Sequence, residues 1–131
     1  MPSQDHVAFR VSDMDAALNF YEETLGLRRV SCQTDEDHHE RFAFLELDGG
    51  HLELLQPLDA LNRPLPYAKP AVEAPYCPHL AIRTDDLDAV AGRLREHGVP
   101  IVKGPLEIPG QVRWLYLADP DNNIIEFVQW L

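Results

Sequence analysis

Polar and apolar side chains alternate along residues 6–11, which is the pattern of a strand with one buried face. The apolar face is expected to pack under a helix that runs from about Asp13, a favourable N-cap, to Gly26, a common C-terminal stop. Apolar residues recur at helical spacing between these two ends. Three further strands are predicted at residues 28–33, 41–47 and 51–56.

The second half of the chain repeats this pattern, and the residues repeat with it. The segment His6-Val-Ala-Phe-Arg returns as His79-Leu-Ala-Ile-Arg, an offset of 73 residues (79 − 6), and Glu53 returns as Glu126 at the same offset (126 − 53). The elements predicted in this half are a strand, a helix stopped by a glycine and three strands, at residues 79–84, 86–97, 100–103, 113–117 and 123–129. The chain is therefore expected to contain two copies of one βαβββ module.

This order predicts an α+β fold in which two βαβββ modules form curved mixed sheets around a central site. We expect one domain, 1–131, made of modules 1–57 and 78–131. The linker 58–77, together with the prolines on either side of it, holds six of the eleven prolines of the chain, which restricts its conformation.

Composition narrows the possible function. The formal net charge of -11, with 22 acidic against 11 basic residues, disfavours nucleic acids and anionic membrane surfaces as partners. No apolar run approaches the roughly 18 residues that a membrane-spanning helix needs, and the start of the chain lacks the pattern of a secretory signal. Cys32 and Cys77 lie far apart, so neither a disulfide framework nor a cysteine metal site is indicated. We expect a cytoplasmic protein that acts on a small molecule.

Histidine and glutamate recur at matched positions of the two modules. Each module begins with a histidine and carries a glutamate 47 residues later (53 − 6 and 126 − 79). Both glutamates interrupt apolar strands, where an ionised carboxylate is costly to bury unless it is paired or bound to a cation. One metal site built from both modules is therefore predicted, with the ligands His6, Glu53, His79 and Glu126. Imidazole and carboxylate ligands without thiolates suit one divalent ion of Ni, Zn, Co, Mn or Fe, with positions left open for substrate.

A purely structural explanation of these residues stays open. Arg10 and Arg83 share a strand face with the two histidines, so Arg10–Glu53 and Arg83–Glu126 ion pairs would also explain the repeat. The candidates for contacts to anionic groups of a substrate are Arg10, Arg41, Arg83 and Arg113.

The remaining histidines are weaker candidates. His51 shares the strand face of Glu53 and either lines the site or lies at the strand end. His38 and His39 fall in a charged loop. His97 closes the second helix, where a positive charge is favourable, so a structural role is expected.

The repeated βαβββ order, the histidine and glutamate of each module and the Asp119-Pro-Asp-Asn-Asn-Ile-Ile-Glu ending resemble the vicinal oxygen chelate superfamily, also called the glyoxalase/bleomycin resistance/dioxygenase group. The resemblance covers nearly the whole chain. It implies curved sheets around a metal and, as in many members, a homodimer, so that the four ligands come from one chain or from two.

Within this group, the ligand set is similar to that of bacterial glyoxalase I, the lactoylglutathione lyase, in which the arginine at the position of Arg10 contacts glutathione. Pro57, however, stands where that enzyme has a glutathione-binding asparagine. The segment Glu53-Leu-Leu-Gln-Pro instead resembles methylmalonyl-CoA epimerase.

The resemblance implies a metal-dependent isomerase or lyase of the lactoylglutathione lyase type, which acts on a small substrate with vicinal oxygens through an enediolate. Glu126 is the preferred base and Glu53 its partner on the opposite face. The alternatives are a methylmalonyl-CoA epimerase-like enzyme, an extradiol-type dioxygenase and a non-catalytic small-molecule binding or resistance protein. A fourth ligand at Glu53 disfavours the dioxygenase, because those enzymes use three protein ligands.

Overall fold

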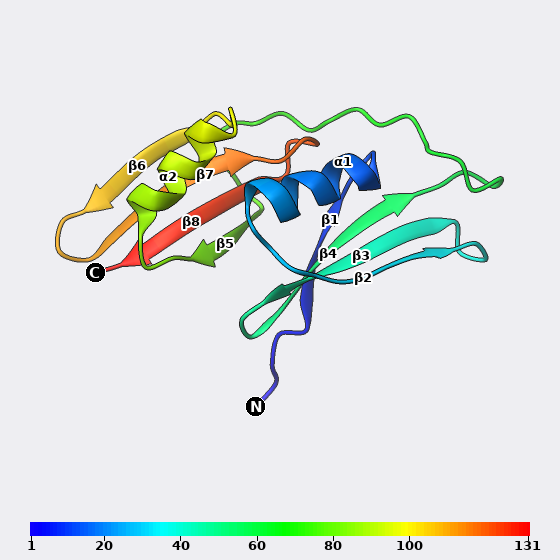
Figure 1. The fold of residues 1–131 in the computed structure, drawn as a ribbon, viewed down its shortest axis with the longest axis horizontal. Coiled ribbons are helices and arrows are strands. Elements are labelled where there is room, and N and C mark those ends of the chain that lie inside the picture. The colour runs from blue at the N-terminus through cyan, green and yellow to red at the C-terminus, as the bar shows by residue number, and fades with distance from the viewer. The chain divides into compact units, whose positions relative to one another are not determined.

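The computed structural model describes all residues, 1–131, and divides the chain into two compact units, Met1–Lys69 and Pro70–Leu131. The boundary falls inside the proline-rich segment 58–77. Each unit contains one four-stranded sheet with parallel and antiparallel neighbours (Figure 1). The predicted α+β fold class with two mixed sheets is thus confirmed.

The sheet of the first unit has the strand order β1-β4-β3-β2. Its strands are β1 (His6–Arg10), β2 (Arg29–Asp35), β3 (Glu40–Leu47) and β4 (Gly50–Pro57). The pairing of β1 with β4 is parallel, and the other two pairings are antiparallel. The first and last strands of the module therefore lie side by side, which brings residues far apart in sequence onto neighbouring strands.

The helix of the first unit begins and ends where the sequence predicts. Asp13 caps α1 (Met14–Asn19), since its carboxylate accepts a hydrogen bond from the Ala16 N–H at 3.2 Å. The helix continues as one turn of π-helix, η1 (Phe20–Thr24), and Gly26 follows it with a φ of 73°. The buried apolar side chains of the helix and of strands β1 and β4 include Phe9, Val11, Met14, Leu18, Leu52 and Leu54.

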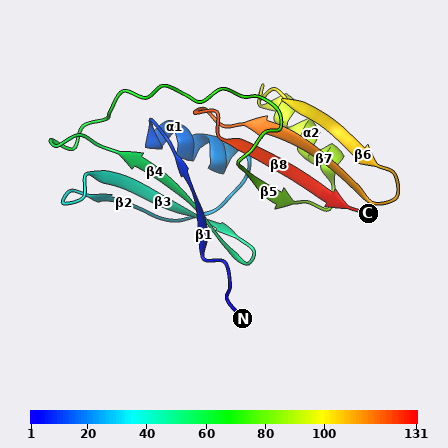
Figure 2. The same cartoon turned by 180° about the vertical axis from the view of Figure 1, so that it is seen from behind.

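The second unit repeats this arrangement with the strand order β5-β8-β7-β6 (Figure 2). Its strands are β5 (His79–Arg83), β6 (Lys103–Ile108), β7 (Val112–Ala118) and β8 (Ile124–Trp130). Asp86 caps α2 (Leu87–Glu96), and Gly98 follows the helix with a φ of 69°. The helices of the chain are too short and too polar to cross a bilayer.

One strand lies at a different place from its prediction. The pattern predicts it at residues 100–103, whereas β6 runs over Lys103–Ile108. Gly104 and Pro105 interrupt the alternation, and the register to β7 shifts between Lys103 and Leu106. β6 is an edge strand, where a proline without an N–H donor is tolerated. Gly104 has a φ of 105°, and a Cβ there would approach the Trp114 carbonyl oxygen to 2.8 Å, so this bulge requires glycine.

A glutamine ties the helix to the last strand in both units. Gln56 of β4 accepts a hydrogen bond from the Met14 N–H and donates one to the Ser12 carbonyl, both at 3.0 Å. Gln129 of β8 accepts from the Leu87 N–H at 3.0 Å. These bonds satisfy an N–H at each helix start, and they fix each helix relative to the strand that carries the glutamate.

The turn from β7 to β8 is organised by one buried carboxylate. Asp119 accepts hydrogen bonds from the Asp121 N–H at 2.9 Å, the Asn123 N–H at 2.8 Å and the Asn123 side-chain amide at 2.8 Å. This turn contains the one residue by which the second module is longer than the first in this region. Equivalent positions are consequently 72 residues apart in β3 and β7, but 73 apart in β4 and β8.

Candidate functional site

The structure places the histidine and glutamate of each module next to each other. His6 begins β1, and Glu53 lies on the parallel neighbour β4 with its carboxylate oxygen Oε1 3.6 Å from His6 Nε2. In the second unit, His79 Nε2 on β5 lies 3.1 Å from Glu126 Oε1 on β8. The glutamate side chains are only 17% and 15% exposed, so each carboxylate needs a nearby proton or cation.

The other ring nitrogen of each histidine is already engaged. His79 Nδ1 lies 2.8 Å from the Tyr76 carbonyl oxygen, which only accepts hydrogen bonds, so Nδ1 carries the proton. His6 Nδ1 lies 2.7 Å from Asp5 Oδ2, a carboxylate that selects the same tautomer. Each Nε2 lone pair then faces a glutamate oxygen, and a proton or a metal ion is needed between these two acceptors. Metal-binding histidines typically have such a second partner on the other nitrogen.

An aromatic ring of the third strand lies against each histidine. Phe44 of β3 is edge-on to His6, with 5.5 Å between the ring centroids. Tyr116 of β7 is edge-on to His79 at 5.4 Å, and the Tyr76 ring packs on it at 4.9 Å. Each aromatic residue is also the direct strand partner of the glutamate. We use the term half-site for each set of histidine, glutamate and aromatic ring.

The sequence analysis did not find the two aromatic residues. Their offset is 72 residues (116 − 44), one less than the offset of the metal-type residues, so they do not align in a simple repeat. The strand pairing makes them equivalent, because Phe44 pairs with Glu53 and Tyr116 pairs with Glu126. The longer turn that begins at Asp119 was the available signal for this one-residue difference.

The hydroxyl of Tyr116 makes the two half-sites chemically different. It forms a hydrogen bond with the Glu126 carboxylate and another with the Trp114 side chain. Burial raises the pKa of Tyr116 above its usual value, and the charge of Glu126 and the hydrogen bond to it raise this pKa further. Tyr116 is therefore a neutral donor to Glu126 at neutral pH. Glu53 instead faces the phenyl ring of Phe44.

A hollow of about 260 Å³ lies beside Glu126 on the second sheet. It is lined by Tyr116, Glu126 and five apolar side chains, namely Ile108, Val112, Trp114, Val128 and Trp130. These positions of β7 and β8 alternate with buried residues such as Leu115 and Phe127, so the hollow lies on the sheet face that points away from the core. We call it the Glu126 hollow.

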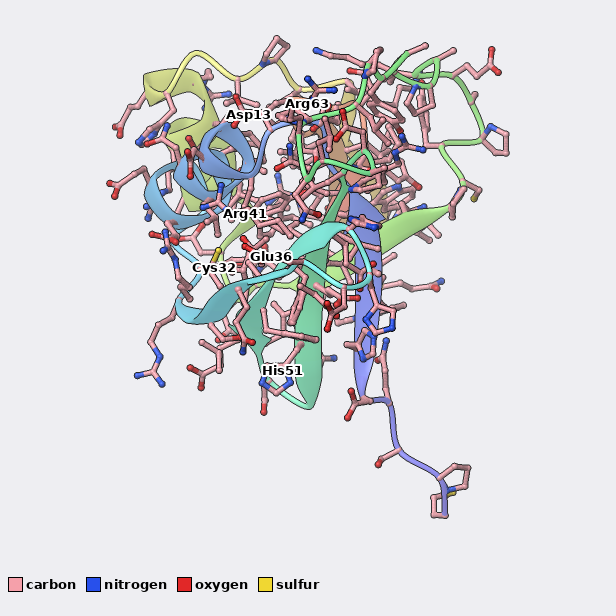
Figure 3. All side chains as sticks on the ribbon, turned by 90° about the vertical axis from the view of Figure 1, so that its right-hand side faces the viewer. Asp13, Cys32, Glu36, Arg41, His51 and Arg63 are labelled. Atoms are coloured by element: carbon pink, nitrogen blue, oxygen red, sulfur yellow. The ribbon has the colours of Figure 1, made fainter.

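Two of the predicted arginine candidates join a strand to a helix. Arg41 donates a hydrogen bond to Asp15 at 3.1 Å (Figure 3), and Arg113 donates one to Asp88 at 3.0 Å. Asp15 and Asp88 lie in the first turns of α1 and α2. The position of Arg113 thus explains a structural role and gives no support to its predicted contact with substrate.

The other two arginines lie on the strand faces of the histidines. Arg10 is exposed, and its guanidinium carbon lies 4.4 Å from the centroid of the Tyr67 ring. Arg83 is exposed and is the strand partner of Val128, at the edge of the Glu126 hollow. Where the sequence left Arg–Glu ion pairs open, the structure forms His–Glu pairs.

The remaining histidines have other partners. The Nδ1 atoms of His38, His39 and His97 lie 2.8, 2.8 and 2.9 Å from Asp35 Oδ2, Asn62 Oδ1 and the Arg93 carbonyl oxygen. His51 lies at the β3–β4 turn (Figure 3) with its ring edge-on to Phe44 at 6.1 Å. Neither unit by itself gathers three His, Cys, Asp or Glu side chains into a metal-binding group, so each unit contributes a pair.

Comparison with known proteins identifies the family. Residues 3–127 match the model of the Glyoxalase/Bleomycin resistance protein/Dioxygenase superfamily. The chain therefore belongs to this superfamily, as its half-sites and its two mixed sheets led us to expect.

Similar proteins in this superfamily have different functions. The lactoylglutathione lyase of Haemophilus influenzae is 26% identical over 132 residues, which cover 95% of this chain and 90% of the lyase. The ethylmalonyl-CoA/methylmalonyl-CoA epimerase of Cereibacter sphaeroides is 31% identical over 98 residues, 75% of this chain and 72% of the epimerase. The crystal structure of TnmS3, an antibiotic binding protein from Streptomyces sp. CB03234, is 28% identical with a TM-score of 0.74, covering 100% of this chain and 98% of TnmS3.

Proposed function

We propose that this chain is a metal-dependent isomerase or lyase of the lactoylglutathione lyase type, which moves a proton on a small substrate with neighbouring oxygen atoms. The observation that carries the proposal is the repetition of the half-site. In each one, a histidine with an engaged Nδ1 turns Nε2 toward a glutamate that is largely shielded from water. One such pair would be a local ion pair, whereas two equivalent pairs fit the two halves of a metal site.

The donor set fits a divalent metal ion. Two imidazole nitrogens and two carboxylates without a thiolate suit Ni, Zn, Co, Mn or Fe. We propose that His6, Glu53, His79 and Glu126 hold one such ion, with the four ligands supplied by one chain or by two chains of a homodimer. A bound ion would remove the repulsion between the acceptors that face each other at 3.6 and 3.1 Å. It supplies Lewis acidity, which polarises the oxygens of the substrate.

Glu126 is the residue that we assign to proton transfer. Its carboxylate borders the Glu126 hollow, where a carbon of the substrate can reach it, and the Tyr116 hydroxyl orients it. The carboxylate would take a proton from the carbon beside a carbonyl group and return it to the adjacent position. Glu53 would act as its partner on the opposite face of the substrate. Arg10 and Arg83 stay candidates for contacts to anionic substrate groups.

A metal-loaded activity screen tests this proposal. The substrates are the glutathione hemithioacetal of methylglyoxal, methylmalonyl-CoA and catechol, with proton exchange into heavy water followed by NMR and oxygen uptake followed separately. We expect proton exchange with one of the first two substrates, loss of this activity with a chelator and recovery with a divalent ion. Oxygen uptake with catechol, or no reaction with any of the three, would contradict the proposal.

A second candidate is a non-catalytic binding protein for small molecules. The specific observation in its favour is the apolar lining of the Glu126 hollow, together with the likeness to the antibiotic binding protein TnmS3. Metal content separates the two candidates. A tightly held divalent ion favours the enzyme, and its absence after metal supplementation favours the binding protein.

A further inference from the structure

The Glu126 hollow has more apolar surface than a site for a charged substrate requires. Two indole rings, Trp114 and Trp130, and three aliphatic side chains line it. Ile108 and Trp130 are 44% and 59% exposed, so large apolar groups at its rim remain in contact with water. Such exposed apolar groups around a small concave surface are typical of a ligand site.

The charges of the lining favour an uncharged ligand. No Lys, Arg or His lines the hollow, and its one ionisable acid, Glu126, already contacts His79 Nε2 at 3.1 Å and the Tyr116 hydroxyl. An anionic group would be repelled by Glu126 without a compensating cation in the lining. A cationic group would compete with His79 for the same carboxylate. Indole faces instead offer large, flat contact surfaces to planar rings.

The apolar lining is specific to the second module. Counting from the Phe44–Glu53 and Tyr116–Glu126 pairs along the strands, the equivalents of Val112 and Trp114 are Glu40 and Phe42. Across the edge strands, Asp35 pairs with Glu40 where Ile108 pairs with Val112. The hollow nearest to Phe42 is accordingly polar, lined by Gln33, Thr34, Asp35, Glu36, Asp37 and Phe42. The module fold alone does not produce an apolar hollow at this place.

We propose that the Glu126 hollow binds a planar, uncharged aromatic part of the ligand, with the oxygen atoms of that ligand directed toward Tyr116 and Glu126. Its volume of about 260 Å³ is below the usual range of sites for drug-sized ligands, so it suits a small ring system and not a whole peptide or nucleotide. This inference rests on the proposed function for the role of Glu126, but the aromatic contact itself requires no metal.

Tryptophan fluorescence gives a direct test. Trp114 and Trp130 are the two tryptophans of the chain, and both line the hollow, so the entire indole emission comes from it. We would titrate the metal-free full chain with 4-nitroanisole, an uncharged planar nitroarene that quenches indole emission. The expected result is saturable quenching with a sub-millimolar Kd, unaffected by an excess of S-methylglutathione, which carries charged groups.

Two variants at exposed positions of edge strands locate the binding. Ile108→Glu places a charge at the rim of the hollow and should weaken binding at least tenfold. Val30→Glu on β2 introduces the same charge in the first unit, at a residue that is 52% exposed, and should leave the Kd unchanged. Circular dichroism checks the fold of both variants, and Trp130→Ala, titrated by calorimetry, provides a second test with an uncharged substitution.

Several results would overturn the inference. Quenching that is linear in probe, equal losses in the two glutamate variants, or displacement by S-methylglutathione would each do so. A blue-shifted emission that no probe changes, in a protein that is dimeric by sedimentation, would show that a second copy fills the hollow. Saturable quenching in a protein that binds no metal would leave this inference intact and contradict the proposed function.

Discussion

The two half-sites share a histidine, a glutamate and an aromatic ring, but they differ in what surrounds the glutamate. In the first, Glu53 faces the Phe44 ring, and acidic residues lie toward the sheet edge. In the second, Glu126 bonds to the Tyr116 hydroxyl and borders an apolar hollow. The ligand geometry has thus remained the same in both copies, whereas the surroundings differ. This contrast suggests that the first half-site only holds the metal, and that the second also contacts the substrate.

The largest expected effect comes from replacing the two glutamates in turn. Glu126→Gln should lower kcat by about 10²- to 10⁴-fold, because the proton-transferring carboxylate is lost while the shape is kept. Glu53→Gln should cause a smaller loss. Turnover of the substrate found in the activity screen, measured at saturating metal, provides the comparison. Equal losses, or a larger loss for Glu53→Gln, would assign the base to the wrong half-site.

The glutamines that tie each helix to its sheet should differ next. Gln56→Leu removes both the acceptor for the buried Met14 N–H and the donor to Ser12, and should lower the free energy of unfolding by about 1–3 kcal/mol. Gln129 is less buried, so Gln129→Leu should cost less. Urea denaturation followed by circular dichroism measures both. If Gln129→Leu proved the more destabilising, the account of how burial sets these costs would be wrong.

Exchanging the two aromatic residues tests the smaller chemical difference. Tyr116→Phe makes the second half-site resemble the first and should lower kcat/KM by about two- to tenfold, the value of one ordinary hydrogen bond. Phe44→Tyr is the matched control and should leave kcat/KM almost unchanged. Activity that is insensitive to Tyr116→Phe would remove the proposed orienting role of the hydroxyl.

The smallest effect should be a pH-dependent one on the outer surface of the second unit. The hydrogen bond from Arg113 lowers the pKa of Asp88, so folding favours the charged form of this carboxyl. Its contribution to stability is therefore present above the usual Asp pKa of about 4 and is lost as the pH falls through the lowered value. Asp88→Asn should lower Tm slightly at pH 7, and the difference from the unaltered protein should vanish in acid. A difference that grew in acid would have the wrong sign.

Periodicity predicted most of the fold, because helix caps and alternating strands are local features. It misplaced β6, where Gly104 and Pro105 break the alternation and only the pairing with β7 defines the strand. The repeat located the histidines and glutamates, and the structure paired them within each unit. It did not reveal Tyr116, whose equivalence depends on a longer turn.

The partners of the two Nδ1 atoms were also beyond sequence analysis, since they achieve the same result by different means. One is the side chain of Asp5, and the other is the backbone carbonyl of Tyr76. A backbone group leaves no signature in the sequence, and the two partners share no residue type. Only the coordinates show that both rings present the same nitrogen to their glutamates.

The central claim is that two half-sites form one metal site, and metal stoichiometry tests it most directly. After metal loading and dialysis, mass spectrometry of the metal content should give one divalent ion per chain. His6→Ala and His79→Ala should each remove this ion, although each changes only one half-site. Two ions per chain, or an ion retained when either histidine is replaced, would show that the half-sites act separately and would contradict the account.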